Sequence, residues 1–199
     1  MKTNTLSSEL LLVGIASSAG GIPPLMDLIE AAFCHKNMAF IIVPHLSREH
    51  ESHLPQILER VSSLQIETIT EGARIKPCHL YVLPPGKYAI VSNHIFHLED
   101  RPLSGPNKAA DILFYSLAQF YQQNAIGVVL SGSSVGSDGS EGVCAIKSNG
   151  GHTYAQDPAT AQFPHMPTLA IETGCIDSIL SAELIGHELT LVGWATEPK

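Results

Sequence analysis

The sequence predicts an α/β fold: a doubly wound, mostly parallel β-sheet that carries an antiparallel hairpin. Three short runs, residues 10–15, 39–43 and 126–130, are apolar or glycine throughout, as in strands buried on both faces of a parallel sheet. Segments with apolar residues three or four positions apart lie between these runs, and this spacing is typical of amphipathic helices. The alternation predicts crossover connections on both faces of the sheet.

The first half of the chain alternates strand and helix before its pattern changes. The strand at 10–15 leads through small residues into a helix that begins near Pro23 and Pro24. A second helix is expected over residues 54–61, and a short edge strand over 66–69. Three short strand-like runs separated by turns then predict an antiparallel meander or hairpin inserted in the parallel scheme. They span residues 79–83, 87–91 and 94–98.

The alternation of helix and strand resumes in the second half of the chain. Helices are expected over residues 110–122, 140–147, 167–172 and 182–187. Strands are expected over residues 126–130, 152–156 and 190–194.

Composition indicates a globular chain, with 44% apolar and 15% charged residues among 199. The net charge of -8 argues against a nucleic-acid partner. No run approaches the roughly 20 apolar residues of a membrane helix, so no membrane insertion is expected. Cys34, Cys78, Cys144 and Cys175 form no C-x-x-C pair, so we expect buried free thiols and a cytoplasmic protein.

Three side chains of complementary chemistry follow three of the buried strands. Ser18 lies in the small-residue turn after the first strand, His45 follows the second, and Asp138 lies in the glycine- and serine-rich loop after residues 126–130. In doubly wound sheets, ligands bind at the carboxyl ends of the strands. A hydroxyl, an imidazole and a carboxylate are the parts of a nucleophilic triad, in which the imidazole deprotonates the hydroxyl and the carboxylate orients the imidazole.

Each of these residues also has a purely structural interpretation. Ser18 is equally typical of a turn or a helix N-cap. His45 fits an exposed loop histidine, and Asp138 fits a cap of the helix that begins near residue 140. The residue types alone therefore leave both interpretations open.

Two other kinds of site have weaker signals. Residues 14–19 form an incomplete G-x-G-x-x-G nucleotide motif, and no acidic residue ends the second strand to bind a ribose. Residues 50–53, His-Glu-Ser-His, are one residue shorter than the zinc-binding H-E-x-x-H motif. A charged, solvated turn is favoured there, and no metal or cofactor is expected.

Several separate motifs, in order along the chain, resemble those of the CheB-type chemoreceptor methylesterase domain, the catalytic part of chemotaxis protein-glutamate methylesterases. They lie at residues 13–21, 40–46, 79–85, 127–132, 136–139, 155–161 and 166–167. The resemblance implies a Rossmann-like three-layer sandwich and a catalytic triad of Ser18, His45 and Asp138. Counting back from the paired glycines at 20 and 21 selects Ser18, and not Ser17, as the nucleophile.

The resemblance also implies an activity and its partners. The family hydrolyses glutamate methyl esters on chemoreceptor helices, and many members deamidate glutamines there. Backbone N–H groups of Ala19 and of the loop residues Ser134 and Val135 would hold the oxyanion. The expected partners are a methylated chemoreceptor-type helical protein and, as a second candidate, a separate regulatory chain. We expect one methylesterase-like domain over residues 1–199, with its core at about 10–185 and no receiver domain.

Two departures from the family pattern leave a second hypothesis open. Residues 133–135 stand where the family has one residue, and His165 and Thr168 flank the motif at 166–167 where the family usually has a glycine and a basic residue. Catalysis tolerates displacements of only about 0.5 Å. The chain is therefore also compatible with a non-catalytic regulatory or binding module whose triad geometry is lost through the longer loop.

Overall fold

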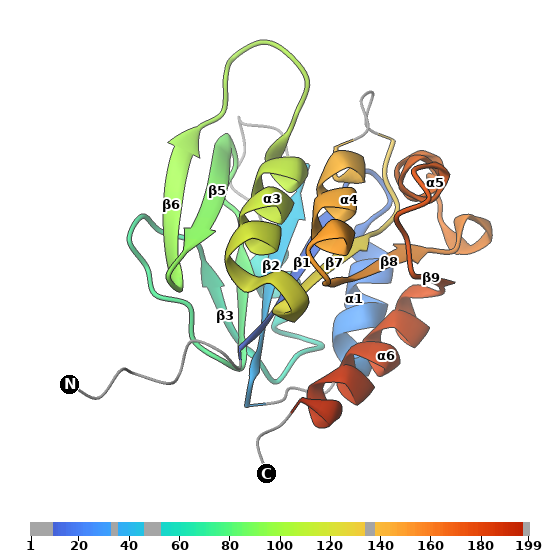
Figure 1. The fold of residues 1–199 in the computed structure, drawn as a ribbon, viewed down its shortest axis with the longest axis horizontal. Helices are drawn as coiled ribbons and strands as arrows, with labels where there is room; N and C mark the ends of the chain where they lie inside the picture. The colour runs from blue at the N-terminus through green and yellow to red at the C-terminus, as the bar shows by residue number, and fades with distance from the viewer. Residues whose placement is uncertain (1–9, 33–35, 46–52, 134–137, 197–199) are drawn as a thin grey trace.

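Seven strands form one parallel sheet in the computed structural model, which describes residues 10–32, 36–45, 53–133 and 138–196 (Figure 1). The strand order is β3-β4-β2-β1-β7-β8-β9, and β5 and β6 form a separate antiparallel pair. The predicted fold class is therefore confirmed. The strands are β1 (Leu11–Ser17), β2 (Met38–Pro44), β3 (Gln65–Thr68), β4 (His79–Val82), β5 (Lys87–Ser92), β6 (Ile95–Asp100), β7 (Ala125–Val129), β8 (His152–Gln156) and β9 (Ser178–Leu180).

Helices cover both faces of this sheet and bury their apolar sides in two separate core clusters. One layer holds α1 (Ile22–Ala31), α2 (Leu54–Leu58) and α6 (Ala182–Ala195). The other holds α3 (Ala109–Tyr121), α4 (Ser140–Ser148), α5 (His165–Glu172) and the β5–β6 hairpin. Short 3-10 turns occur at η2 (Gln122–Asn124) and η3 (Pro158–Thr160). None of the helices in the described ranges combines the length and apolar character that a membrane span needs.

Strand β1 is apolar or glycine from residue 11 to residue 16 because it supplies side chains to both cores. Leu11, Val13 and Ile15 enter one cluster, while Leu12 and Ala16 enter the other. A strand with water on one face would instead alternate apolar and polar residues. The unbroken apolar run in the sequence therefore reflects the central position of β1, between β2 and β7.

The chain leaves β1 and β7 in opposite directions, although these strands are neighbours. From β1 the chain continues through α1 to β2 on one side, and from β7 it continues through α4 to β8 on the other. In doubly wound sheets, the crevice outside the carboxyl ends of two such strands is the usual ligand site. We therefore expect a binding site where β1 and β7 end.

Two glycines in register let α3 and α4 lie close to the sheet. Gly14 on β1 is opposite Gly127 on β7. A Cβ on Gly14 would lie 2.7 Å from Cε1 of Phe114, and a Cβ on Gly127 would lie 2.9 Å from Cδ1 of Ile146. Both distances are shorter than real Cβ contacts, so larger residues would push α3 and α4 outward.

The last two of the three expected short strands form the antiparallel hairpin. Asn93 and His94, with φ of 51° and 61°, make a two-residue turn whose backbone twist matches that of paired strands. The first expected strand, β4, instead lies parallel between β2 and β3. The hairpin packs on α3 and fills the side of that layer next to it (Figure 1).

The predicted strand at residues 190–194 is wrong, because this segment is the end of α6. The buried residues of α6 include Ala182, Ile185 and Leu189, three or four positions apart, whereas Leu191 and Trp194 are 52% and 59% exposed. A short apolar run fits a strand and a helix equally well when its burial is unknown. The last strand of the sheet is β9, which has three residues and pairs only with β8.

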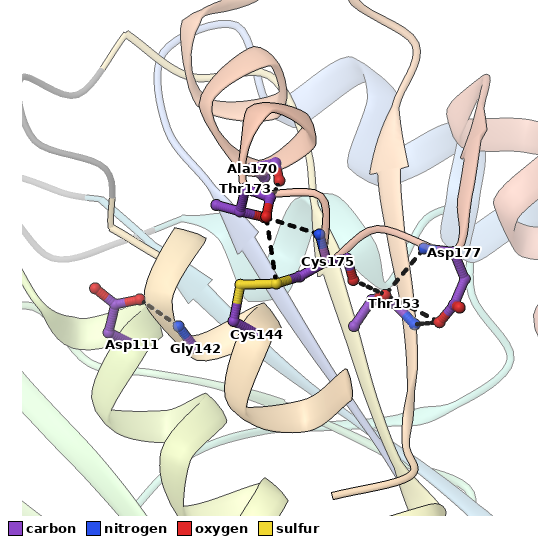
Figure 2. The surroundings of a disulfide bond; sticks show 8 residues. All are labelled: Asp111, Gly142, Cys144, Thr153, Ala170, Thr173, Cys175 and Asp177. Carbon is purple, nitrogen blue, oxygen red and sulfur yellow. Dashed lines mark hydrogen bonds between the residues drawn. A yellow bond between two sulfur atoms is a disulfide. The ribbon is translucent and has the colours of Figure 1, made fainter. Parts of the chain in front are cut away.

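The expectation of free thiols is wrong for two cysteines. Cys144 on α4 and Cys175 after α5 form a disulfide, with their Cα atoms 5.0 Å apart (Figure 2). They are 31 residues apart in sequence, and only the packing of α4 beside α5 brings them together. Cys78 keeps its thiol and is half-buried, and Cys34 lies outside the described residues. Because two cysteines are paired, thiol chemistry no longer indicates a reducing compartment, and the cytoplasmic location stays a prediction.

Hydrogen bonds around Thr153 fix the segment that carries Cys175. The Thr153 hydroxyl donates to the Cys175 carbonyl at 2.6 Å, and the Thr153 N–H donates to Oδ2 of Asp177 at 2.9 Å (Figure 2). Asp177 also pairs with Lys147 near the end of α4. The disulfide therefore joins α4 to a segment that is already tied to β8.

We expect this disulfide to stabilise the folded chain. Replacing Cys144 and Cys175 together by Ser should lower the free energy of unfolding by about 3 kcal/mol, because the bond closes a loop of some 30 residues in the unfolded chain. Urea denaturation of the oxidised proteins measures the difference. Dithiothreitol should lower the wild-type value to that of the double variant and leave the variant unchanged. Equal stability of the oxidised wild type and the variant would contradict the assignment.

Candidate active site

The carboxyl ends of β1, β2 and β7 are tied together by backbone hydrogen bonds. Ser17 and Pro44 are opposite each other in the register of β1 and β2, and the N–H of His45 donates to the Ser17 carbonyl at 2.9 Å. On the other side, the N–H of Ser18 donates to the carbonyl of Ser131 at 3.0 Å. Ser18 therefore leaves the sheet between His45 and Ser131.

Ser18 is half-buried in the turn before α1, and it does not cap that helix. The cap position is Gly21, whose N–H donates to the Ser18 carbonyl at 2.9 Å. The N-cap interpretation of Ser18 is therefore wrong. No hydrogen bond joins the Ser18 hydroxyl to His45 among the described residues. Such contacts are often long in enzymes without substrate and tighten when it binds.

His45 and Asp138 form a short, buried hydrogen bond. Nε2 of His45 lies 2.6 Å from Oδ2 of Asp138. The two side chains are 6% and 0% exposed, so His45 is not the exposed loop histidine of the structural interpretation. Away from water, a hydrogen bond to a charged group is stronger than it would be on the surface. The longer loop at 133–135 thus leaves the Asp138 carboxylate in contact with His45.

The Asp138 carboxylate also caps α3. It accepts hydrogen bonds from the N–H of Ala110 at 3.1 Å and from the N–H of Asp111 at 2.9 Å. The N-cap residue of α3, Lys108, makes no side-chain cap of its own. Asn107 Oδ1 accepts from the N–H of Ala109 at 3.2 Å, so Asp138 supplies the acceptors for the next two N–H groups of the helix, and adds negative charge at its N-terminus. The expectation that Asp138 caps the helix at residue 140 is wrong, because the N-cap of α4 is Gly139.

Gly132 packs against both Ser18 and the start of α5. Its N–H donates to the Phe163 carbonyl at 2.9 Å, and its carbonyl accepts from the N–H of Met166 at 3.0 Å. A Cβ at Gly132 would lie 2.8 Å from Cβ of Ser18 and would collide with the Met166 side chain. The preceding N–H, that of Ser131, donates to Oε1 of the buried Gln156 at 2.9 Å. The backbone beside Ser18 is thus fixed from β8 and α5.

The predicted oxyanion donors are only partly within the described structure. Ala19 is exposed in the turn after Ser18. Ser134 and Val135 lie outside the described residues. Their role therefore stays a prediction.

A cavity of about 360 Å³ lies beside the turn that carries Ser18. Gly20 and Gln162 line it on the side of that turn, and Asp27 of α1 and Glu183 of α6 also line it. Ser18, His45 and Asp138 do not line the cavity, which adjoins the turn at Gly20.

No cluster of three or more His, Cys, Asp or Glu side chains within the described part of the chain could hold a metal ion. Residues 50–52 of the His-Glu-Ser-His segment lie outside the described residues.

Comparison with known proteins identifies the family. Residues 13–189 match the family described as CheB methylesterase. The chain belongs to the CheB methylesterase family. The resemblance seen in the sequence is thus confirmed, and the chain is assigned to the carboxylic-ester hydrolases.

Similar proteins share this family. A Leptospira interrogans protein (serovar copenhageni, strain Fiocruz L1-130) named "Putative protein-glutamate methylesterase/protein-glutamine glutaminase" is 31% identical over 185 residues, which cover 92% of this chain and 93% of that protein. Protein-glutamate methylesterase/protein-glutamine glutaminase 1 of Myxococcus xanthus is 28% identical over 90% of this chain, which spans only 53% of that protein. The crystal structure of the Thermotoga maritima CheB methylesterase catalytic domain has a TM-score of 0.82 at 26% identity, covering 92% of this chain and 98% of that one.

The sequence did not indicate the buried residues that hold the backbone of the candidate site in place. Gln156 and Asp111 are buried polar residues that bond the backbone next to Ser18 and Asp138. From the sequence alone, Asp111 is an ordinary acidic residue in the first turn of its own helix. Nothing in its spacing signals that its side chain bonds another helix.

We expect the loss of the Asp138 carboxylate to lower stability. Asp138→Ala should reduce the free energy of unfolding by about 2 kcal/mol, because it leaves two buried N–H groups of α3 without acceptors. Asp27→Ala, which removes an exposed carboxylate on α1, should change it by less than about 0.5 kcal/mol. Urea denaturation measures both variants. A fall for Asp138→Ala no larger than that for Asp27→Ala would show that Asp138 does not cap α3.

Proposed function

We propose that this chain is a protein-glutamate methylesterase that hydrolyses glutamate methyl esters on a chemoreceptor-type helical protein. In this proposal Ser18 is the nucleophile, His45 is the general base, and Asp138 orients His45. The observation that carries it is the 2.6 Å bond between His45 and Asp138 beside the Ser18 turn. Family membership and the relatives' names support the substrate class.

The two ring nitrogens of His45 have different roles in this mechanism. Nε2 faces Asp138, so we assign it the proton of the neutral ring. Nδ1 then carries the lone pair and accepts the proton of the Ser18 hydroxyl. When the ring becomes an imidazolium, the buried Asp138 carboxylate stabilises its positive charge.

The proposed reaction has two steps. Ser18 Oγ attacks the ester carbonyl carbon while its proton passes to Nδ1 of His45. The tetrahedral intermediate then expels methanol, which takes that proton, and a glutamyl-Ser18 ester remains. In the second step, water gives a proton to His45 and attacks the carbonyl carbon of this ester. The bond to Ser18 Oγ breaks, Oγ takes the proton from His45, and the glutamic acid formed loses its own proton to solvent.

Backbone N–H groups complete the proposed site. The N–H of Ala19 and those of Ser134 and Val135 would hold the oxyanion of each tetrahedral intermediate, and one such donor contributes about 3 kcal/mol in other hydrolases. The same steps convert a glutamine side chain to glutamate with release of ammonia. The relatives named glutaminase support deamidation as a second reaction of this site.

The partners follow from the substrate. A methylated helical segment of a chemoreceptor-type protein would place its ester over Ser18, and the cavity lined by Gly20 and Glu183 would accept a neighbouring side chain. A separate regulatory chain and a single domain over residues 1–199 remain predictions of the sequence.

Replacing the nucleophile tests the proposal. Ser18→Ala should reduce kcat/KM for methanol release from a methylated chemoreceptor fragment by about 10³-fold or more, because no other hydroxyl is placed beside His45 in the proposal. Ser17→Ala is the matched control, since it removes the neighbouring hydroxyl and should change kcat/KM less than about threefold. Methanol production is followed by a coupled oxidase assay. Unchanged turnover by Ser18→Ala would overturn the assignment of Ser18.

A further inference from the structure

Asp111 is a buried carboxylate that the proposed reaction does not use. It lies in the first turn of α3 and is 1% exposed. Its Oδ1 accepts hydrogen bonds from the N–H of Gly139 at 2.9 Å and from the N–H of Gly142 at 2.8 Å (Figure 2 shows the bond to Gly142). Both donors belong to the N-terminus of α4, so Asp111 caps a helix other than its own.

Asp111 and Asp138 cap each other's helices. Asp138, just before α4, accepts from the first N–H groups of α3, and Asp111, on α3, accepts from those of α4. The exchange closes a ring. The Asp111 N–H donates to Oδ1 of Asp138, and the N–H of Gly139, the residue after Asp138, donates back to Oδ1 of Asp111. Such a ring fixes the Asp138 side chain and the backbone that carries it at the same time.

The groups around Asp111 shift the pKa of its carboxyl in opposite directions. Burial raises the pKa of Asp111, and the nearby Asp138 charge raises it further, while the Gly142 N–H and Lys108 act in the opposite direction. Lys108 Nζ lies 3.2 Å from Oδ2 of Asp111. Two carboxylates can share this buried place because two helix N-termini and one ammonium group face them.

We propose that Asp111 is a positioning residue, which holds Asp138, and through it His45, in the orientation that activates Ser18. The expected effect of Asp111 on turnover rests on the proposed function. Its expected effect on the His45–Asp138 bond rests on geometry alone. Through Gly139, a residue with φ of 96°, the ring controls the direction in which the chain leaves Asp138.

Three variants separate positioning from general stability. Asp111→Ala removes Oδ1, the one atom that accepts from both α4 N–H groups. Asp111→Asn keeps a carbonyl oxygen that can take both bonds, because both donors use Oδ1. Asp177→Ala is the matched control: its carboxylate also accepts from a backbone N–H, that of Thr153, and pairs with Lys147 of α4, away from Asp138.

The first readout is the His45–Asp138 bond itself, which does not depend on turnover. A proton on Nε2 that is shared with a carboxylate gives a downfield proton resonance, which His45→Gln identifies by its loss. We expect the wild type, Asp111→Asn and Asp177→Ala to keep this resonance. Asp111→Ala should lose it or shift it upfield.

The second readout is methanol release, analysed as kcat and KM separately. Asp111→Ala should lower kcat by about 100-fold with KM within about threefold, because a displacement of about 1 Å in a catalytic group has this effect on rate. Asp111→Asn should recover kcat to within about fivefold of wild type, and Asp177→Ala should match wild type. If Asp111→Ala does not fold, as judged by circular dichroism, Asp111→Ser replaces it with the same expectations.

The outcomes distinguish the two proposals. The positioning role is overturned if Asp111→Ala keeps both the resonance and a kcat within threefold of Asp177→Ala. It is also overturned if Asp177→Ala, equally destabilised, loses the resonance as well. A wild type without methyl-esterase activity would overturn the proposed function alone, and the resonance would still decide the role of Asp111.

Discussion

The Asp138 carboxylate accepts three hydrogen bonds, one from His45 and two from the N-terminus of α3, and the arrangement of the site depends on them. Backbone N–H groups at a helix N-terminus stabilise a buried carboxylate by hydrogen bonds and by the helix dipole. Oδ2 of Asp138 lies 2.6 Å from Nε2 of His45, and both side chains are shielded from water. The same group serves the stability of α3 and the geometry of the candidate active site, so neither can change without the other.

The rest of the fold brings these groups to one place. The parallel register of β1 and β2 puts His45 directly after the residue opposite Ser17, and Ser131, two residues after β7, supplies the carbonyl that accepts from the Ser18 N–H. The glycine pair in β1 and β7 lets α3 and α4 lie against the sheet, which brings their N-termini to the strand ends. The candidate active site is therefore assembled from strand ends, two helix N-termini and glycine contacts, and the surrounding core holds each part in place.

Much of this could be predicted from local sequence, and the remainder depends on packing. The buried strands were predictable because unbroken apolar runs identify strands with two covered faces, and Ser18, His45 and Asp138 each follow one of them. Residues 190–194 were misassigned because five residues do not distinguish a helix period from a strand period. The Cys144–Cys175 bond and the contact of Asp111 with Gly139 join residues 31 and 28 positions apart, and no local pattern records such pairs.

The central claim is that the buried Asp138 carboxylate orients His45, and that His45 in this orientation makes the Ser18 hydroxyl reactive. The most direct measurement is to treat the full chain with a fluorophosphonate, which labels only activated serines, and to map the adduct by peptide mass spectrometry. The account predicts one adduct, on Ser18, and none after His45→Gln. No adduct, or one on another serine, would contradict it and would favour a non-catalytic module on the same fold.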